Sequence, residues 1–203
     1  MTSSIQKFKS SFKYDPAKQN SFDVNITLPP NLPSLGVTSR DLTFKCQMAE
    51  LPGRTMATIE QKTYGPVEKF PYVTMFNDID LTFIIEDDML NKAFFDNWMN
   101  YISPLSTNNY NYKSNYCCNM IINQYDLTGK ISYSVELIES FPLSVNQLSL
   151  DWSSDDYHKL TVTFAYTRWE PRKIPDDLKS LDDAQFGVPP EASWRPRKSL
   201  RPV

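Results

Sequence analysis

The chain has 203 residues, which is long enough for one domain with a sizeable core and additional arms. Its 15 prolines and only 5 glycines favour a strand-rich body with extended connections and argue against a helix bundle. The net charge of −3 is uneven: residues 20–170 hold 18 acidic and 10 basic side chains, so this body would repel the phosphates of a nucleic acid.

Cysteine use and hydropathy argue against two further classes. Cys46, Cys117 and Cys118 do not make a disulfide framework, because the count is odd and two of them are adjacent. No secretory signal is visible, and no apolar run approaches the length of about 18 residues that a membrane helix needs. We therefore expect a chain that is made in a reducing cytosol.

Residues 1–19 are predicted to form an N-terminal arm. Ile5, Phe8 and Phe12 recur at the spacing of a short amphipathic helix, which the Asp-Pro pair at 15–16 would end. A frayed terminus explains the same stretch equally well, so the sequence leaves both interpretations open.

Two strands are predicted next, over residues 20–28 and 42–48. Apolar and polar residues alternate in both, which predicts one dry face and one wet face. The inward positions are Phe22, Val24, Ile26 and Leu28 in the first strand and Leu42, Phe44, Cys46 and Met48 in the second. The proline-rich segment 29–36 between them cannot form a ladder and is predicted to be a loop.

Residues 53–76 are polar and mixed, with few large apolar side chains, and are predicted to form a long hairpin that leaves the body. A further strand is predicted over residues 79–85, because four apolar residues alternate there. They are Ile79, Leu81, Phe83 and Ile85.

One helix is predicted over residues 87–103. Asp87 and Asp88 supply a carboxylate for its N-cap, and Ser103-Pro104 ends it. The apolar stripe consists of Leu90, Phe94, Phe95, Trp98 and Ile102. We expect this helix to plug one end of a β-sandwich or barrel.

The stretch 131–169 organises the second half of the chain, after a surface loop at 107–116, a strand at 120–125 and a turn at 126–130. Two runs alternate with period two, which predicts strands. Their apolar positions are Ile131, Tyr133, Val135 and Leu137, and then Leu160, Val162, Phe164 and Tyr166. Phe141-Pro142 and the polar cluster 151–156 break the pattern and are predicted to be turns.

Residues 171–203 are predicted to form a C-terminal arm, because they hold 6 of the 15 prolines and show little periodicity. A solvated tail is one interpretation. The other is an arm that lies on an acidic neighbouring subunit or on another protein of the same particle. The candidate anchors are Trp194, Arg195 and Arg197.

Several of these stretches together resemble the tail tube proteins of contractile-tailed, T-even-like bacteriophages, over about residues 20–170. The N-terminal part of the resemblance is carried by Asn20, Phe22, Val24, Ile26, Phe44, Cys46, Leu51 and Pro52, as a hairpin, and the middle part by a strand running into a helix that ends near F-x-x-W. The C-terminal part is carried by Phe141, Pro142, Leu148, Leu150, Asp151, Trp152, Asp155, Thr163, Phe164, Tyr166, Trp169 and Glu170.

The resemblance implies a mainly β fold of the tail tube type, an antiparallel sandwich or barrel with one capping helix. It ends at about residue 170, so the two arms rest on composition alone, and the expected domain limits are 1–19, 20–170 and 171–203. The core motif that it implies consists of Phe22, Cys46, Trp98, Trp152 and Trp169. It further implies homohexameric rings that stack into a tube, within a sheath, through which DNA leaves the virion. The candidate contacts between rings are Arg54, Thr58, Gln61, Tyr64 and Lys69.

Candidate catalytic chemistry is sparse. His158 is the only histidine, and no nucleophile motif, C-x-x-C or phosphate-binding glycine loop accompanies it. Adjacent carboxylates at 87–88 and 155–156 are interpreted as a helix cap and a turn, and those at 176–177 and 182–183 lie in the C-terminal arm. A glycosidase-like carboxylate pair stays open as the alternative. We predict no enzyme, no cofactor and no metal.

The expected partners are further copies of the chain, the tail sheath protein, and baseplate and tail terminator proteins, while DNA passes without specific binding and no membrane is involved. The expected location is the virion tail, after assembly in the host cytoplasm. Three alternatives stay open: a baseplate protein that starts or ends the tube, the tube of a bacterial contractile injection system, and a small monomeric β-rich enzyme.

Overall fold

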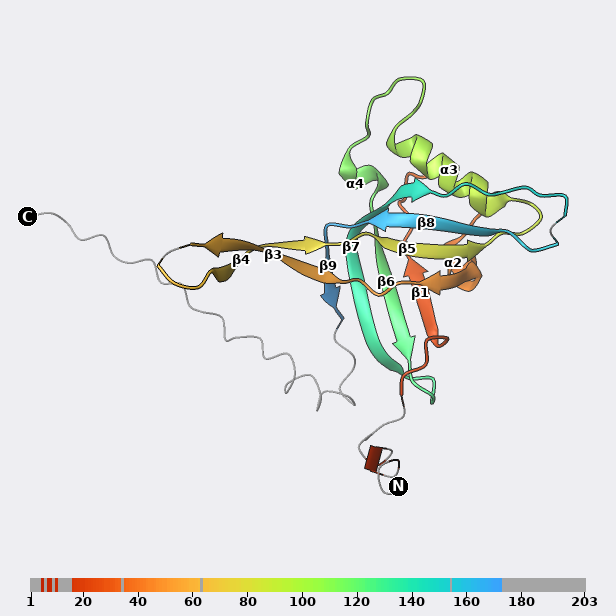
Figure 1. Cartoon of the computed structure of the whole chain (residues 1–203). Coiled ribbons are helices and arrows are strands. Elements are labelled where there is room, and N and C mark those ends of the chain that lie inside the picture. The colour runs from red at the N-terminus through yellow and green to blue at the C-terminus, as the bar shows by residue number, and fades with distance from the viewer. Residues whose placement is uncertain are drawn as a thin grey trace, which may run out of the picture. The chain divides into compact units, whose positions relative to one another are not determined.

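A computed structural model describes Ile5, Lys7, Phe8, Ser10 and residues 16–33, 35–62, 64–153 and 155–172 (Figure 1). The strands are β1 (Phe22–Ile26), β2 (Cys46–Ala49), β3 (Arg54–Gln61), β4 (Glu68–Phe76), β5 (Ile79–Ile84), β6 (Cys118–Tyr125), β7 (Ile131–Val145), β8 (Lys159–Ala165) and β9 (Arg168–Pro171). The helices with defined limits are α2 (Ser39–Lys45), α3 (Leu90–Ile102) and α4 (Lys113–Tyr116). None of the described helices is long and apolar enough to cross a membrane.

Seven antiparallel strands form the body, in the order β1-β6-β7-β8-β5-β2, with β9 also paired to β7. The long strand β7 belongs to two parts of this sheet. Its first part pairs with β6 and β9, and residues 141–145 pair with β8. We call β1-β6-β7-β9 the first half-sheet and β7-β8-β5-β2 the second. The predicted fold class is confirmed: the chain is mainly β and antiparallel, with one long helix against the sheet.

The predicted turn at Phe141-Pro142 is wrong, because β7 runs through both residues. Pro142 lies opposite Phe164 of β8, and the pairing is irregular directly after it. Glu139 has a φ of 56°, close to the place where β7 leaves β6 for β8. A proline is tolerated in a strand where the ladder is irregular, so this residue sits where the strand changes partners and does not end it.

The predicted strand at 42–48 is also wrong over most of its length. Residues 39–45 form α2, and only β2 is extended. Thr38 explains the helix: its Oγ1 accepts from the backbone N–H of Asp41 at 3.3 Å, and its own N–H donates to the Asp41 carboxylate at 2.9 Å. This capping box satisfies donors that a helix start leaves free. Consequently Leu42 is buried, whereas Phe44 points outward with 73% of its surface exposed.

The N-terminal hairpin implied by the resemblance is not formed. Strand β1 pairs with β6, and β2 pairs with β5. The alternation predicted within β1 is confirmed, because Val24 and Ile26 are buried while Asn25 is exposed. Its partner could not be read from neighbouring residues, since β6 lies almost a hundred residues further along the chain.

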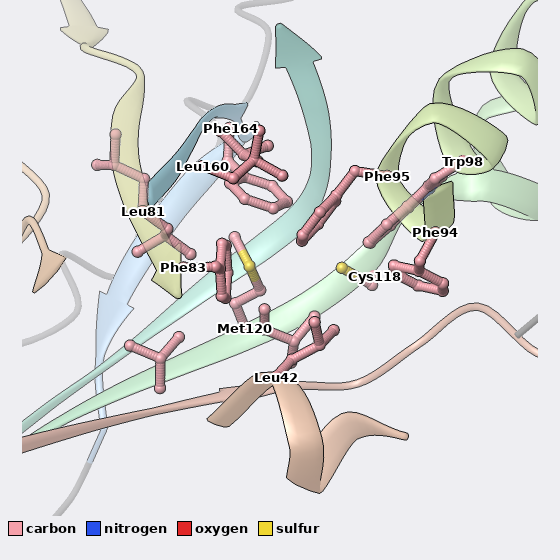
Figure 2. Packing of buried hydrophobic residues seen from close by; sticks show 14 of the residues in the cluster. Leu42, Leu81, Phe83, Phe94, Phe95, Trp98, Cys118, Met120, Leu160 and Phe164 are labelled. Atoms are coloured by element: carbon pink, nitrogen blue, oxygen red, sulfur yellow. The ribbon is translucent and has the colours of Figure 1, made fainter. Parts of the chain in front are cut away.

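The core lies between the sheet and α3. Phe94, Phe95 and Trp98 of this helix are fully buried, and they meet Phe83 of β5 and Phe164 of β8 (Figure 2). The ring centroids are 5.1 Å apart for Phe83–Phe95 and 6.2 Å apart for Trp98–Phe164, which is the range of favourable aromatic pairs. The predicted capping helix is therefore confirmed as the element that completes the core.

The start of α3 differs in detail from the prediction. Met89, with a φ of 53°, occupies the N-cap position, and the helix begins at Leu90. Asp88 lies one residue earlier than a side-chain cap would, yet its Oδ1 still accepts from the N–H of Leu90 at 3.0 Å. The carboxylate thus satisfies one free donor of the first turn without being the N-cap.

The five residues of the implied core motif differ in how deeply they are buried. Trp98 is buried, and Phe22, Cys46 and Trp169 are partly buried against the core. Trp152 is fully exposed, with a relative surface of 107%, so its assignment to the core is wrong. It lies in a loop between β7 and β8, where no part of the described sheet covers it.

Candidate assembly surfaces

The long hairpin predicted at 53–76 is present as β3 and β4, which pair only with each other among the described strands. Ala49 lies opposite Leu81 in the body and Arg54 lies opposite Phe76 in the hairpin. Arg54 lies five residues after Ala49, and Phe76 lies five residues before Leu81. The number of residues between the two pairs is thus the same on both strands, so β3 and β4 keep the register of β2 and β5. The hairpin is therefore an extension of two body strands, and Figure 1 shows it extending away from the sheet.

Two contacts fix the base of the hairpin to the body. The indole Nε1 of Trp169 donates to the carbonyl oxygen of Gly53 at 3.3 Å. The rings of Phe76 and Tyr166 lie 6.1 Å apart between their centroids. Gly53 precedes β3 and Phe76 ends β4, whereas Trp169 belongs to β9 and Tyr166 follows β8, so both ends of the hairpin contact the body.

One face of the hairpin is apolar. Residues opposite each other in a ladder share a face, and alternate residues of a strand share it too. Tyr72 is an extra residue of β4 between two pairs, which leaves the faces of β3 unchanged. The apolar part of this face consists of Ala57, Ile59, Phe70, Val73 and Met75, and its four large side chains keep 46–50% of their surface exposed. Thr55 lies on the same face beside the body, and Gln61 and Glu68 lie on it at the far end.

The five predicted contacts between rings are all in the hairpin but not on one face. Arg54, Thr58 and Lys69 lie on the face opposite the apolar one, where Lys69 pairs with Glu60 at 3.8 Å. Gln61 lies on the same face as Ile59, at the far end of β3, and Tyr64 is fully exposed in the tip. Sequence reasoning chose polar residues and missed the apolar face. The alternation of Ala57 with Ile59 and of Val73 with Met75 was the signal that could have revealed it.

The loop 146–158, between β7 and β8, forms a second exposed surface, which we call the acidic loop. It contains three carboxylates and no lysine or arginine. Leu150 and Trp152 are 86% and 107% exposed. The predicted turn at 151–156 lies within it, and Asp151 holds that turn by accepting from the N–H of Ser153 at 3.0 Å.

The acidic loop encloses an open groove of about 800 Å³. Its apolar and aromatic lining consists of Leu148, Leu150, Trp152 and Tyr157, and its charged lining consists of Asp151, Asp156 and Lys159. The Tyr157 hydroxyl accepts from Gln47 Nε2 at 3.2 Å, which ties the groove to β2. The groove therefore combines apolar side chains with two carboxylates and one lysine.

Strand edges form the third surface. Within the described part of the chain, β1 pairs only with β6, β2 only with β5, and β9 only with β7. Each of these strands has one side without a ladder partner, and such edges bind other strands readily.

The outer face of the first half-sheet is polar and internally bonded. Asn123 Nδ2 donates to Asp23 Oδ1 at 2.8 Å, and Ser134 Oγ donates to Asn123 Oδ1 at 2.6 Å. The hydroxyl of Tyr125 donates to the other oxygen of Asp23 at 2.8 Å. Burial, and secondarily the neighbouring carboxylate of Asp23, raise the pKa of Tyr125. Asp23, Asn123 and Ser134 each stand next to a core residue in their strand, so their side chains point to the face that is opposite the core. These polar side chains make that face hydrophilic.

The candidate chemical groups do not converge on one site. No three of the His, Cys, Asp and Glu residues that the structure describes are placed to hold a metal ion. Burial raises the pKa of the Cys46 thiol to about 12 and also raises that of Cys118 and Cys117. Thiols with raised pKa values are poor nucleophiles at neutral pH. His158 is the last residue of the acidic loop, and its carbonyl oxygen accepts from Ile85 N–H at 3.1 Å.

One ionic cluster ties α4 to the sheet. Lys113 Nζ donates to Glu139 Oε2 and to Thr167 Oγ1, each at 2.6 Å. The hydrogen bond to Glu139 raises the pKa of Lys113, and the hydrogen bonds from Lys113 and Thr167 lower the pKa of Glu139. The pair is half exposed and lies where the backbone of β7 is irregular, at Glu139.

The predicted arm anchors Trp194, Arg195 and Arg197 lie outside the described residues, as does Phe12. Ile5 and Phe8 are helical and exposed, in agreement with a short N-terminal helix.

Comparison with known proteins gives a consistent result. A family model described as phage tail tube protein matches residues 17–171. No curated protein matches the chain.

Three solved structures have a similar fold. A chain of the anti-feeding prophage baseplate is 15% identical, covers 80% of this chain and 99% of its own length, and has a TM-score of 0.59. A chain of the tube terminating cap of the same prophage is 18% identical, with coverages of 80% and 95% and a TM-score of 0.57. A chain of the extended sheath–tube complex of an extracellular contractile injection system is 16% identical, with coverages of 82% and 97% and a TM-score of 0.54.

Proposed function

The chain belongs to the phage tail tube protein family, and from this premise we propose that it forms the inner tube of a contractile tail as stacked homohexameric rings. The observation that carries the proposal is the family match, which spans the whole described body from residue 17 to residue 171. In this reading residues 20–170 are the ring-forming domain, and residues 1–19 and 171–203 are arms.

Ring closure uses the free strand edges. The edge strand β1 or β2 of one copy pairs with an edge strand of the next copy. Each copy is rotated relative to the one before it, and the last copy pairs with the first to close the ring. Such pairing satisfies backbone donors and acceptors that a single copy leaves to water. It also continues the sheet of one copy into that of its neighbour, which makes the ring a closed barrel.

Stacking of rings uses the hairpin. Strands β3 and β4 extend beyond the body, and a two-stranded ribbon is marginally stable unless it packs against something. Arg54, Thr58, Gln61, Tyr64 and Lys69 stay the candidates for polar contacts between rings, and the apolar face adds a surface that water would not cover favourably.

The polar outer face of the first half-sheet is the candidate channel wall. Its side chains bond to each other, and the body as a whole has an excess of carboxylates. A wall without basic clusters does not hold phosphates, so DNA would pass without specific binding. The outer partners in this assembly are the sheath protein, the baseplate and the tail terminator. The arm residues Trp194, Arg195 and Arg197 are the candidates for contact with one of them or with an acidic neighbouring subunit.

A second function is a baseplate or terminator protein that starts or ends the tube. The similar folds of a baseplate chain and a cap chain motivate this alternative, because both have TM-scores at least as high as the chain from the sheath–tube complex. Their identities are below 25%, so the likeness concerns the fold alone. A tube of an injection system that delivers protein in place of DNA uses the same rings and is the third form of this function.

Electron microscopy of the purified full-length chain tests these functions. We expect hollow filaments with six-fold rotational symmetry at micromolar protein concentration. Isolated rings that do not stack would favour the initiator or terminator. A chain that stays monomeric at every concentration would contradict all three.

A further inference from the structure

We propose that the apolar face of the hairpin in one copy binds the groove of the acidic loop in a copy of the adjacent ring. This inference rests on the proposed tube function and adds the receptor site to it. The occupant of the groove is thus a second copy of this chain, bound head to tail. Four features of the described residues support the assignment.

The first feature is the exposure of the hairpin. Ile59, Phe70, Val73 and Met75 present a contiguous apolar surface on one side of a ribbon that no described element covers. Eight residue pairs join β3 and β4, so the ribbon is about 25 Å long, and the apolar residues occupy the part of it that is nearer the body. An apolar surface of this kind on a projecting element marks a contact site.

The second feature is the exposure of the groove. Trp152 and Leu150 lie two residues apart in the acidic loop and are almost entirely solvent-accessible. A tryptophan rarely stays so exposed in a protein without a partner, and tryptophan is enriched among residues that dominate binding energies. The groove of about 800 Å³ between Trp152 and Tyr157 offers apolar walls to the side chains of a ribbon.

The third feature is the position of the two surfaces at opposite ends of the second half-sheet. The hairpin joins β5 at Ile79, which pairs with Phe164. The acidic loop joins β8 at Lys159, which pairs with Ile84 at the other end of the same two strands. In Figure 1 the hairpin and the β7–β8 loop accordingly extend from opposite sides of the sheet. Complementary patches at opposite ends generate an open, repeating stack.

The fourth feature is charge. The acidic loop carries Asp151, Asp155 and Asp156, and Lys159 at the start of β8 is the one basic side chain that lines its groove, whereas residues 54–76 carry three basic and two acidic side chains. The hairpin is therefore the more positive partner. Opposite charges at the rim of an apolar contact favour its formation and fix its register.

Disulfide trapping in assembled full-length protein tests the contact directly. The variant combines Ile59→Cys with Leu150→Cys on a Cys117→Ser background, and each single cysteine variant is the control. After oxidation we expect covalent chains longer than six copies on a denaturing gel, because every copy is linked to one ring above and one below. A series that ends at six copies would instead place the hairpin on a neighbour in the same ring and would overturn the proposal.

Two further substitutions separate this contact from general assembly. We expect Trp152→Ala to raise the concentration needed for tubes by about tenfold or more while isolated rings persist. Tyr110→Ala, which removes another aromatic that is 79% exposed, is the matched control and should assemble like the parent. Tubes of Trp152→Ala at the parent concentration would refute the assignment of the groove.

A charge exchange supplies the last test. Asp155→Lys should block stacking, and adding Lys62→Asp in the same chain should restore it, since both interface charges are then reversed. Failure of the second substitution to restore tubes, with rings intact, would contradict the proposed pairing of these surfaces. If the parent chain forms neither rings nor tubes, the proposed function fails and this inference fails with it, a result distinct from the loss of stacking alone.

Discussion

The indole Nε1 of Trp98 donates a hydrogen bond to the backbone carbonyl oxygen of Tyr116 at 3.0 Å. This single bond joins the buried face of α3 to the segment that leads into β6. Trp98 also lies among Phe94, Phe95 and Phe164, so the side chain combines aromatic packing with satisfaction of a backbone acceptor. Trp98 therefore adds a hydrogen bond to the aromatic packing that Phe95 also makes with the sheet.

Replacing Trp98 by alanine should lower the free energy of unfolding by about 3–5 kcal/mol, because a large buried ring leaves a cavity and an unsatisfied carbonyl. Urea unfolding of the unassembled chain, followed by circular dichroism, measures the change. Trp152→Ala is the control and should shift stability by no more than about 0.5 kcal/mol, since that ring is exposed. Equal losses for the two variants would contradict the packing described for Trp98.

Asn123 bridges Asp23 and Ser134 and is only 7% exposed. Its replacement by alanine leaves the buried hydroxyl of Ser134 without its acceptor, so we expect a loss of about 1–3 kcal/mol in unfolding free energy. Asn25→Ala, on the exposed face of the neighbouring strand, should cost much less. The comparison of both variants in the same denaturant titration checks the network.

The Lys113–Glu139 pair gives stability a defined pH dependence. Because Lys113 lowers the pKa of Glu139 in the folded state, the contribution of Glu139 is present above its unfolded pKa of about 4.3 and is lost as pH falls through the folded value. The raised pKa of Lys113 acts in the opposite range: its contribution is present below the unfolded pKa of about 10.4 and is lost as pH rises through the folded value.

Lys113→Met should therefore flatten the acid slope of the unfolding free energy between about pH 5 and pH 3. Lys69→Met, which removes a lysine from an exposed pair in the hairpin, is the matched control and should leave this slope unchanged. An acid slope that is the same in the parent and in Lys113→Met would show that the cluster does not control the titration of Glu139.

The thiols should differ in reactivity. Cys118 is buried and the pKa of Cys46 is raised to about 12, so at pH 8 almost no thiolate forms at Cys46. We expect a thiol reagent to modify Cys117 before the other two cysteines, and Cys117→Ser to remove this first phase. In 8 M urea, a concentration chosen to unfold the chain, all three should react at similar rates. Rapid labelling of native Cys46 would contradict its environment.

Sequence periodicity predicted the elements that bury one face. Strands β5 and β8 follow their alternation closely, and the stripe of α3 contains the residues that fill the core. These predictions succeeded because a strand or helix with one buried face must repeat its apolar residues at the period of its own backbone. For these elements the spacing of the apolar residues was enough to predict which side chains are buried.

The errors came from effects that periodicity does not contain. Leu42 and Phe44 alternate as in a strand, but the capping box of Thr38 and Asp41 started a helix there. Those two residues were visible in the sequence as a helix start signal. Trp152 was assigned to the core as part of the motif that the family resemblance implies, whereas the acidic loop holds it in solvent. A large apolar residue that serves an intermolecular contact has the same sequence signature as a core residue.

Because the register of β2 and β5 continues into β3 and β4, the tip of the hairpin is the one place where this ladder can change length without disturbing the core. Lengthening each strand by two residues would extend the projection by about 7 Å and preserve which side is apolar. Lengthening each by one residue would turn the apolar side chains beyond the insertion to the opposite side. Relatives that differ in axial spacing could thus diverge in steps of two at this tip while keeping an identical interior.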